Sequence, residues 1–268
     1  MNADFHAVTR ERHAQRSWRK FSSYQWAAGA NLVPIVAPEL ATAAMHLPIG
    51  FVHKEGEPPL TVAVLGFEPG VNLFVAADGR WLGGYVPAML RMRPFALLPA
   101  PDGKLVLCVD EAAGEVRELP GAPGTEPFFT PEGELAPAVK QVMEFVSRVE
   151  DNKAPTAAAA AALKEHGLLV PWKITLQTDA GPREVEGLLK VEEAKIAGLP
   201  DEAFLALRRA HALPLLYAHL LSSQNMPLLG QLARARAAAL KQQNVMPVTA
   251  NGELDLSFMN GGDTLRFS

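Results

Sequence analysis

Short apolar runs separated by turn residues fill the first half of the chain, and this pattern is typical of strands. The runs FALLPA (95–100) and KLVLCVD (104–110) are joined by turn residues, so they predict an antiparallel pair. An Asp-Gly pair at 78–79 is a second hairpin signal. We therefore predict a strand-rich, mainly antiparallel segment over 47–110. Its other strands are expected in the runs IGFVHKE (49–55), LTVAVLGFE (60–68) and NLFVA (72–76).

Two helices are predicted among these strands because proline is tolerated in a first helical turn and ends a helix that precedes it. The first begins at Pro38 and ends before Pro48. The second lies near 84–93, with Pro87 in its first turn and Pro94 at its end.

Apolar residues at helical spacing replace the strand pattern in the second half. Two consecutive helices are predicted over 135–153 and 155–167, the second ending at Gly167, which suits a C-cap. A β-hairpin is expected around 179–182, and helices return over 199–212 and 214–243.

These elements predict an α+β fold with helices packed on a mainly antiparallel sheet in the N-terminal half. The C-terminal half is expected to be helix-rich with a β-hairpin, and the whole to form one compact unit. The predicted divisions are an irregular lead-in (1–24), a domain over 25–244 that is strand-rich (25–133) and then helix-rich (134–244), and a C-terminal tail (245–268) whose run ELDLSFM suggests a small strand.

Composition narrows the class of protein. The chain has 268 residues, of which 49% are hydrophobic, and a formal net charge of −4, so nucleic-acid binding has no electrostatic support. No apolar window is long enough for a transmembrane helix. The N-terminus lacks the apolar core of a secretory signal, and we expect a cytoplasmic protein. The single cysteine, Cys108, lies in an apolar run and is expected to be a buried, inert thiol.

Sequence signatures of catalysis are missing. The seven histidines include no pair at the i, i+4 spacing of a metalloprotease helix, and no phosphate-binding glycine loop or GxSxG motif occurs. We therefore predict no metal and no cofactor, and assign no catalytic residue.

The stretch GRWLGGYVPAMLRMRPFAL (79–97) has two interpretations. It can be a corner between a strand and a helix whose apolar face covers the sheet. It can also present Trp81, Tyr85, Arg91 and Arg93 as a lip for a peptide or an anionic group, because Trp, Tyr and Arg dominate binding hot spots.

A second set of candidates lies on the helical segment that follows Arg209. His211, Tyr217 and His219 lie on or beside a leucine stripe, which is more typical of core packing than of a cofactor site. Together with Tyr85 and Arg91 they are the residues that a dispersed polar active site would use.

Several spaced motifs resemble the SapC family of bacterial proteins. They include GANLVPIVAPEL, VLGFEPGVNLFV, the 79–97 stretch, ALKEHGLLVPWKI and, most specifically, EGLLKVEEAKIAGLPDEAFLALRRAHALPLLYAHLLS, and they extend over about residues 20–235. The family is named after a surface-layer gene cluster, and the resemblance implies an uptake or modification pathway. It carries over no catalytic residue set. The alanine-rich helix and the 245–268 tail depart from the family pattern.

Three functional hypotheses follow. The first is a non-catalytic accessory protein of such a pathway that binds a protein or peptide partner. The second is an enzyme with a dispersed polar site, acting on a peptide or small metabolite. The third is a structural subunit of an envelope layer, which would need an export route. The sequence does not define an oligomeric state.

Overall fold

The fold was analysed in a computed structural model, which describes residues 4–118, 123–178 and 181–244. It confirms the α+β class: helices pack on sheets in which every described strand pair is antiparallel. The predicted tail strand in 245–268 lies outside the described residues.

The strands form four small sheets. The largest has five strands in the order β10-β13-β4-β5-β3, two others have three strands each (β1-β7-β6 and β8-β2-β9), and β11 pairs with β12 as the predicted hairpin. The strands are β1 (Phe5–Ala7), β2 (Ser17–Trp18), β3 (Leu32–Pro34), β4 (Ile49–Val52), β5 (Leu60–Val64), β6 (Phe95–Pro99), β7 (Leu105–Asp110), β8 (Val116–Arg117), β9 (Glu126–Pro127), β10 (Leu169–Pro171), β11 (Ile174–Thr178), β12 (Gly181–Val185) and β13 (Leu188–Val191).

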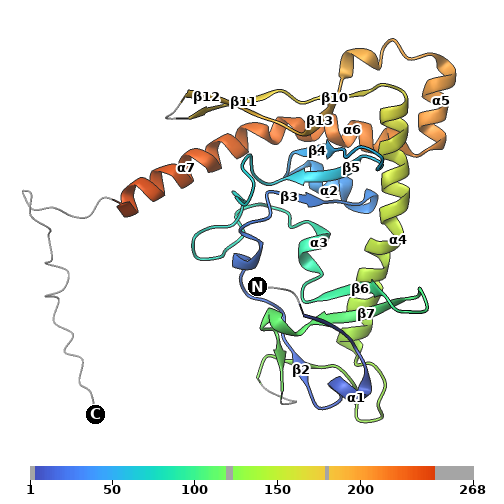
Figure 1. The fold of residues 1–268 in the computed structure, drawn as a ribbon, viewed down its shortest axis with the longest axis vertical. Coiled ribbons are helices and arrows are strands. Elements are labelled where there is room, and N and C mark those ends of the chain that lie inside the picture. The colour runs from blue at the N-terminus through green and yellow to red at the C-terminus, as the bar shows by residue number, and fades with distance from the viewer. Residues whose placement is uncertain (1–3, 119–122, 179–180, 245–268) are drawn as a thin grey trace, which may run out of the picture.

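The helices are short in the first half of the chain and long in the second (Figure 1). The α-helices are α1 (Arg10–His13), α2 (Leu40–Ala44), α3 (Ala88–Arg91), α4 (Pro137–Glu165), α5 (Asp201–Arg209), α6 (Ala212–Ser222) and α7 (Met226–Asn244). The 3-10 turns are η1 (Gln25–Ala27), η2 (Ala37–Glu39), η3 (Glu111–Ala113), η4 (Glu193–Lys195) and η5 (Ser223–Asn225).

The buried apolar side chains form two separate clusters, which we call the first and second core. The first core lies between the five-stranded sheet and helices α2, α4 and α6, and its largest members include Phe51 and Phe74. The second core joins β6 and β7 to the N-terminal half of α4 and contains Trp18, Phe95 and Phe128. The predicted domain boundaries stay a prediction.

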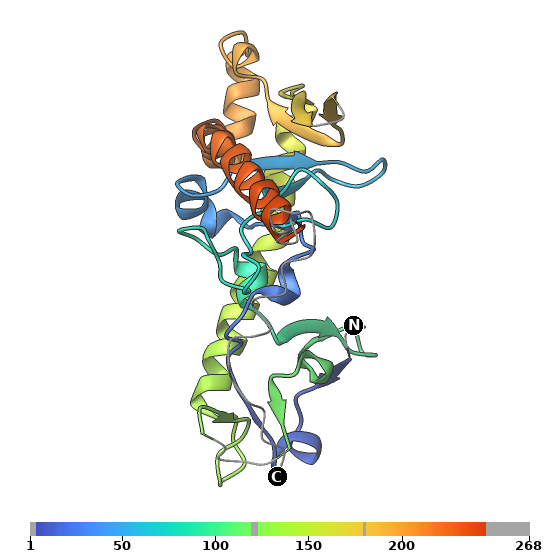
Figure 2. The same ribbon diagram turned by 90° about the vertical axis from the view of Figure 1, so that its left-hand side faces the viewer.

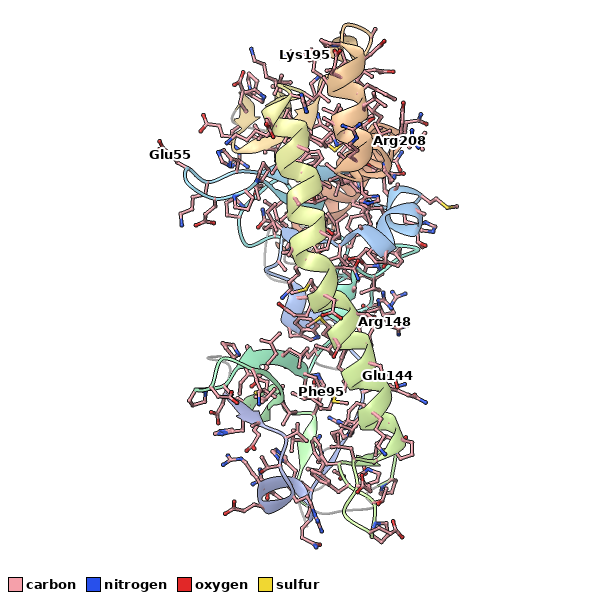
Figure 3. All side chains as sticks on the ribbon, turned by 90° about the vertical axis from the view of Figure 1, so that its right-hand side faces the viewer. Glu55, Phe95, Glu144, Arg148, Lys195 and Arg208 are labelled. Carbon is pink, nitrogen blue, oxygen red and sulfur yellow. The ribbon has the colours of Figure 1, made fainter. Side chains whose placement is uncertain are left out.

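One helix joins the two cores. Helix α4 buries Val139, Val146 and Val149 in the second core and Ala160 and Leu163 in the first. In Figures 2 and 3 it runs along most of the elongated molecule, with the five-stranded sheet at one end and β6 and β7 at the other.

The prediction of two helices over 135–153 and 155–167 is wrong, because α4 passes through Pro155 without a break. Proline removes one N–H from the helical ladder. The next residue, Thr156, donates its hydroxyl proton to the Asn152 carbonyl at 2.6 Å and accepts the amide of Ala37 at 2.9 Å. Packing against the turn at Ala37 thus stabilises the helix where its sequence weakens it.

The N-terminal segment also differs from its prediction. Instead of an irregular lead-in, β1 pairs with β7 and β2 pairs with both β8 and β9. His13 at the end of α1 is fully buried and lies 3.2 Å from Glu111, which also binds Arg16 at 2.9 Å. These partners lie about a hundred positions away in the sequence, so local patterns do not reveal them.

Prolines occupy both edges of the five-stranded sheet. The edge strand β3 contains Pro34 and the edge strand β10 contains Pro171. Because proline has no N–H, these edges offer an incomplete set of backbone donors to any further strand.

Candidate functional site

The stretch 79–97 leads the chain from the first core to the second. Trp81 and Tyr85 pack against the first core, whereas Met92 and Phe95 are buried in the second. The predicted strand over 72–76 is reduced to one isolated bridge between Val75 and Trp81. The hairpin turn at 78–79 is confirmed by the bond from the Ala76 amide to the Arg80 carbonyl.

The helix in this stretch is shorter than predicted. It covers only Ala88–Arg91, because Pro87 is its N-cap with an extended backbone (ψ 142°) and Pro94 follows closely. Proline disfavours helical geometry in the residue before it, which limits the helix on both sides. Tyr85, which lies inside the predicted helix, therefore precedes the observed one.

The Gly-Gly pair allows a close approach of neighbouring rings. A Cβ atom at Gly84 would lie 2.6 Å from Nδ1 of His46, and one at Gly83 would lie 2.9 Å from the Phe74 ring. Both positions exclude a side chain unless those rings move.

Aromatic rings from two separate segments meet beside the Gly-Gly pair. Trp81 stacks on Phe74 with centroids 5.5 Å apart and also contacts Tyr24 at 5.4 Å. Phe21 continues the row, with its centroid 5.1 Å from Tyr24 and 5.6 Å from Trp26. The row is partly exposed, and Trp26 keeps 37% of its surface in contact with solvent.

Tyr85 is fixed by a buried carboxylate. Its hydroxyl donates to Oε2 of Glu39 at 2.7 Å, and the same oxygen accepts the Ala88 amide at 2.8 Å. The other oxygen of Glu39 accepts the Val36 amide at 2.9 Å. Burial, followed by the hydrogen bond to Glu39, raises the pKa of Tyr85 to about 12, so its hydroxyl stays protonated at neutral pH.

Arg91 lies against this tyrosine. Its Nε donates to the Val86 carbonyl at 3.0 Å and its Nη2 donates to the Tyr85 hydroxyl at 3.2 Å. Its guanidinium also lies 5.5 Å from the centre of the Tyr85 ring and 5.0 Å from that of Phe145 on α4.

Arg93 has a different environment. Its Nη2 donates to the Ala113 carbonyl at 2.9 Å, and its Nε lies 3.5 Å from a carboxylate oxygen of Glu115. The guanidinium also lies 4.8 Å from the centre of the Trp26 ring. A carboxylate therefore balances the charge of Arg93.

These contacts bring together the four candidates of the 79–97 stretch with three aromatic residues of the N-terminal segment. We call this group the junction surface, and its members are Phe21, Tyr24, Trp26, Trp81, Tyr85, Arg91 and Arg93. It presents flat rings and cationic groups held by hydrogen bonds, and this chemistry suits recognition of a partner.

His219 does not belong to the junction surface. It is buried between β4 and β13, where its Nε2 accepts the Val191 amide at 3.1 Å and its Nδ1 bonds the Ile49 carbonyl at 2.8 Å. A carbonyl only accepts, so the ring must be neutral with its proton on Nδ1. Burial lowers the pKa of His219 to about 4, which agrees with this assignment.

His211 and Tyr217 are both exposed on or beside α6. His211 precedes α6 and has a left-handed backbone conformation (φ 54°). No described hydrogen bond, ion pair or ring contact joins either residue, or His219, to Tyr85 or Arg91. The structure therefore brings together only part of the predicted set.

Sequence reasoning missed the residues that hold the junction surface in place. Asn72 is fully buried, donates to the Ala27 carbonyl at 3.1 Å and accepts the Phe74 amide at 3.0 Å, which joins η1 to the Phe74 segment. Glu39 lies in the first turn of the helix predicted to begin at Pro38, where a glutamate can accept free backbone N–H groups, and this signal could have revealed it.

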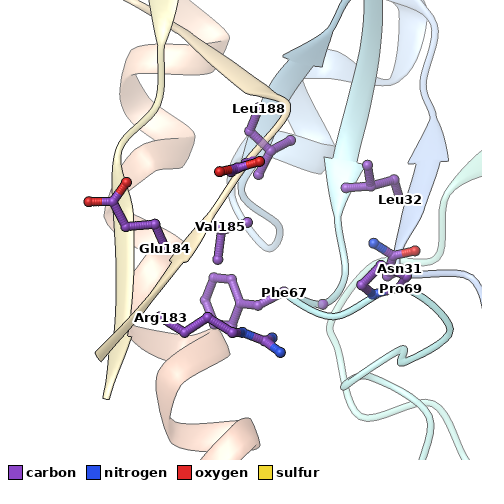
Figure 4. Close-up of a pocket in the computed structure, with 10 residues that line it drawn as sticks. Asn31, Leu32, Phe67, Pro69, Arg183, Glu184, Val185 and Leu188 are labelled. Atoms are coloured by element: carbon purple, nitrogen blue, oxygen red, sulfur yellow. The ribbon is translucent and has the colours of Figure 1, made fainter. Parts of the chain in front are cut away.

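A groove of about 420 Å³ lies elsewhere, between β12 and the segments that flank β3 and β5 (Figure 4). Phe67, Val185 and Leu188 line it together with Arg183. The guanidinium of Arg183 is paired with Glu68 at 3.0 Å, so this cation already has a partner.

Residues 4–118, 123–178 and 181–244 contain no group of three or more His, Cys, Asp or Glu side chains that could hold a metal ion. Among the same residues, no helix combines the length and the apolar character that a membrane crossing needs. Cys108 is buried, as predicted, and burial raises the pKa of its thiol.

The fold and this surface define an α+β protein with antiparallel sheets, two cores and an aromatic–arginine surface at their junction. The chain belongs to the SapC family, whose family model matches residues 8–229 and confirms the resemblance noted in the sequence. No curated protein and no solved structure matches the chain.

Proposed function

We propose that this protein is a non-catalytic accessory protein that binds a protein or peptide partner through its junction surface. One observation carries the proposal. The junction surface gathers two of the four tryptophans and two of the three tyrosines of the chain around Arg91 and Arg93, while Trp26 stays 37% exposed. These three residue types supply most of the binding energy in protein interfaces.

The surface is also ordered before any partner arrives. Tyr85 and Arg91 are fixed by hydrogen bonds, and Trp81 donates its indole proton to the Tyr85 carbonyl at 2.9 Å. Binding to side chains that are already ordered loses less conformational entropy.

Addition of a partner strand to the large sheet is a less favourable mode. Pro34 and Pro171 lie in its two edge strands and remove donors that such a strand would need. The groove beside β12 does not support the proposal either. Its arginine, Arg183, is already paired with Glu68, and β12 itself contains Pro182.

The enzyme hypothesis requires Tyr85, Arg91, His211, Tyr217 and His219 to converge. Tyr85 and Arg91 meet, but His219 is buried between two strands and no described contact links the α6 residues to the pair. No observation therefore favours this hypothesis over partner binding. A role in a surface-layer or uptake pathway rests on family membership alone, and a cytoplasmic location stays a prediction.

Site-specific photo-cross-linking in the native cells tests the proposal. A photoreactive phenylalanine analogue replaces Trp26 in one variant and Phe204 in the other, because both side chains are 37% exposed and Phe204 lies on α5, outside the junction surface. We expect one discrete protein adduct at position 26 and none at position 204. No adduct at position 26, or equal adducts at both positions, would exclude the junction surface as the binding site.

A further inference from the structure

Arg91 has no direct carboxylate partner among the described residues. Arg93, two positions away, lies 3.5 Å from Glu115, whereas no ion pair within 4–118, 123–178 and 181–244 includes Arg91. The residue is exposed, so an external anion can reach it.

The guanidinium is nevertheless held in one orientation. Its bonds to the Val86 carbonyl and the Tyr85 hydroxyl use two donors, and the rings of Tyr85 and Phe145 lie 5.5 and 5.0 Å from its central carbon. A guanidinium has five N–H donors in a planar fork that fits a carboxylate with two parallel bonds. Three donors therefore remain for a ligand.

Apolar ring surface lies on both sides of this arginine's segment. The rings of Tyr85 and Phe145 lie beside the guanidinium itself, and elsewhere on the junction surface the Tyr24 ring is packed between Phe21 and Trp81.

We infer that Arg91 is the anchor for a single carboxylate of the partner, carried by an acidic side chain with an apolar neighbour. The apolar neighbour packs on the rings of the junction surface. This inference rests on the proposed function, because it names the chemistry that the junction surface recognises.

Arg91 and the buried carboxylate of Glu39 share one tyrosine hydroxyl. Glu39 accepts a hydrogen bond from the same Tyr85 hydroxyl that Arg91 contacts, at 2.7 Å. Because the attraction to Arg91 and the repulsion from Glu39 both scale with the charge of the ligand, the choice of a carboxylate rests on the planar fork and on the apolar rings beside it, and phosphate is the competing anion in the test.

Side-chain NMR of the full protein, labelled with ¹⁵N-arginine, tests the inference directly. The Nε–H of Arg91 is bonded to the Val86 carbonyl, which slows its exchange with water and makes its signal observable. The probes are the capped tripeptides Ac-Leu-Glu-Leu-NH₂ and Ac-Leu-Gln-Leu-NH₂, and separately inorganic phosphate at matched ionic strength. We expect a saturable shift of this signal with the glutamate peptide. Its dissociation constant should be at least about tenfold lower than that of the glutamine analogue.

Two variants complete the test, and their affinity for the glutamate peptide is compared with that of the wild type by isothermal titration calorimetry, because Arg91→Lys has no Arg91 signal. Arg91→Lys keeps the charge but not the fork, so binding should weaken several-fold, while Arg148→Lys on the exposed face of α4 should leave it unchanged. Equal binding of both peptides, tighter binding of phosphate, or full binding by Arg91→Lys would overturn the inference.

Failure of the inference and failure of the proposed function give different results. If the photo-cross-link at position 26 persists at full yield in an Arg91→Met background, the surface binds a partner without this anchor. If the cross-link never forms while Arg91 binds the glutamate peptide, the carboxylate site exists but the partner-binding function is wrong.

Discussion

At the scale of single residues, the His219 ring bridges β4 and β13 at a position where the two strands make no direct backbone hydrogen bond. The β4–β13 ladder pairs Val52 with Leu188 and Phe51 with Leu189, and continuing it would pair Ile49 with Val191. The imidazole instead lies between those two residues and bonds both of them. It can do so only when neutral, because a proton on Nε2 would face the Val191 N–H.

This requirement predicts a stability that depends on pH. The pKa of His219 is about 4 in the folded chain, against 6.5 in the unfolded chain, so between these values the unfolded state binds more protons. Stability is therefore greatest above pH 6.5 and falls as the pH drops toward 4, by about 3 kcal/mol in total from this group. Urea unfolding at a series of pH values measures the loss.

A pair of variants isolates the contribution of His219. His13 is also buried with a lowered pKa and contributes in the same direction, so the comparison must be between variants. His219→Gln should be less stable at pH 7 and should lose most of the slope between pH 6.5 and 4, whereas His211→Gln, on an exposed residue beside the same helix, should keep it. An unchanged slope in His219→Gln would show that the ring is not the titrating group.

Tyr85 allows a second prediction at this scale. Tyr85→Phe removes one of the donors to the buried Glu39 and the acceptor for Arg91, so the free energy of unfolding should fall by about 1–3 kcal/mol. Tyr217→Phe is the control, because that hydroxyl is on an exposed side chain and should change stability by less than about 0.5 kcal/mol. Urea unfolding compares the two, and equal stability of Tyr85→Phe and wild type would contradict the role assigned to Glu39.

At the scale of elements, the behaviour of α4 depends on its tertiary contacts. Its sequence contains Pro155, and the missing N–H leaves the Asp151 carbonyl without its helical donor. Pro155→Ala should therefore stabilise the protein by about 1–3 kcal/mol, measured as a shift of the thermal midpoint.

The matched control is Pro137→Ala. Pro137 occupies the first position of the same helix, where an N–H has no helical partner in any case, so this change should be nearly neutral. A destabilised Pro155→Ala variant would mean that the ring of Pro155 itself makes a necessary packing contact.

Features were predicted correctly where the contacting residues are close in the sequence, and were missed where they are far apart. The β6–β7 pair and the β11–β12 hairpin were predicted correctly, because turn residues join each pair locally. The continuity of α4 was missed because it depends on Thr156 bonding Ala37, 119 positions away. Likewise, Tyr85 and Arg91 were predicted as candidates, but Glu39 lies 46 positions from Tyr85 and no local pattern connects them.

At the scale of the whole molecule, two cores share one helix. A mutation in one core should therefore promote local unfolding of the strands around that core more than of those around the other. Val146→Ala in the second core should cost about 2 kcal/mol and speed amide exchange in β6 and β7 while β4 and β5 keep their protection. Leu163→Ala in the first core should give the reverse pattern.

Hydrogen exchange measured by mass spectrometry distinguishes these outcomes, because β4 and β6 fall in separate peptides. Uniform acceleration in both variants would show that the molecule unfolds only as one cooperative unit, in spite of its two clusters of buried residues.

The span of α4 between the cores also constrains how this protein can change over generations. Val149 is buried in one core and Ala159 in the other, and the helix is continuous between them. Adding or deleting one residue there would turn one end relative to the other by about 100° and move it by about 1.5 Å. The apolar residues of one half of α4 would then no longer face the core in which they are buried. Exchanges of the exposed residues in this span are tolerable, but its length must stay the same.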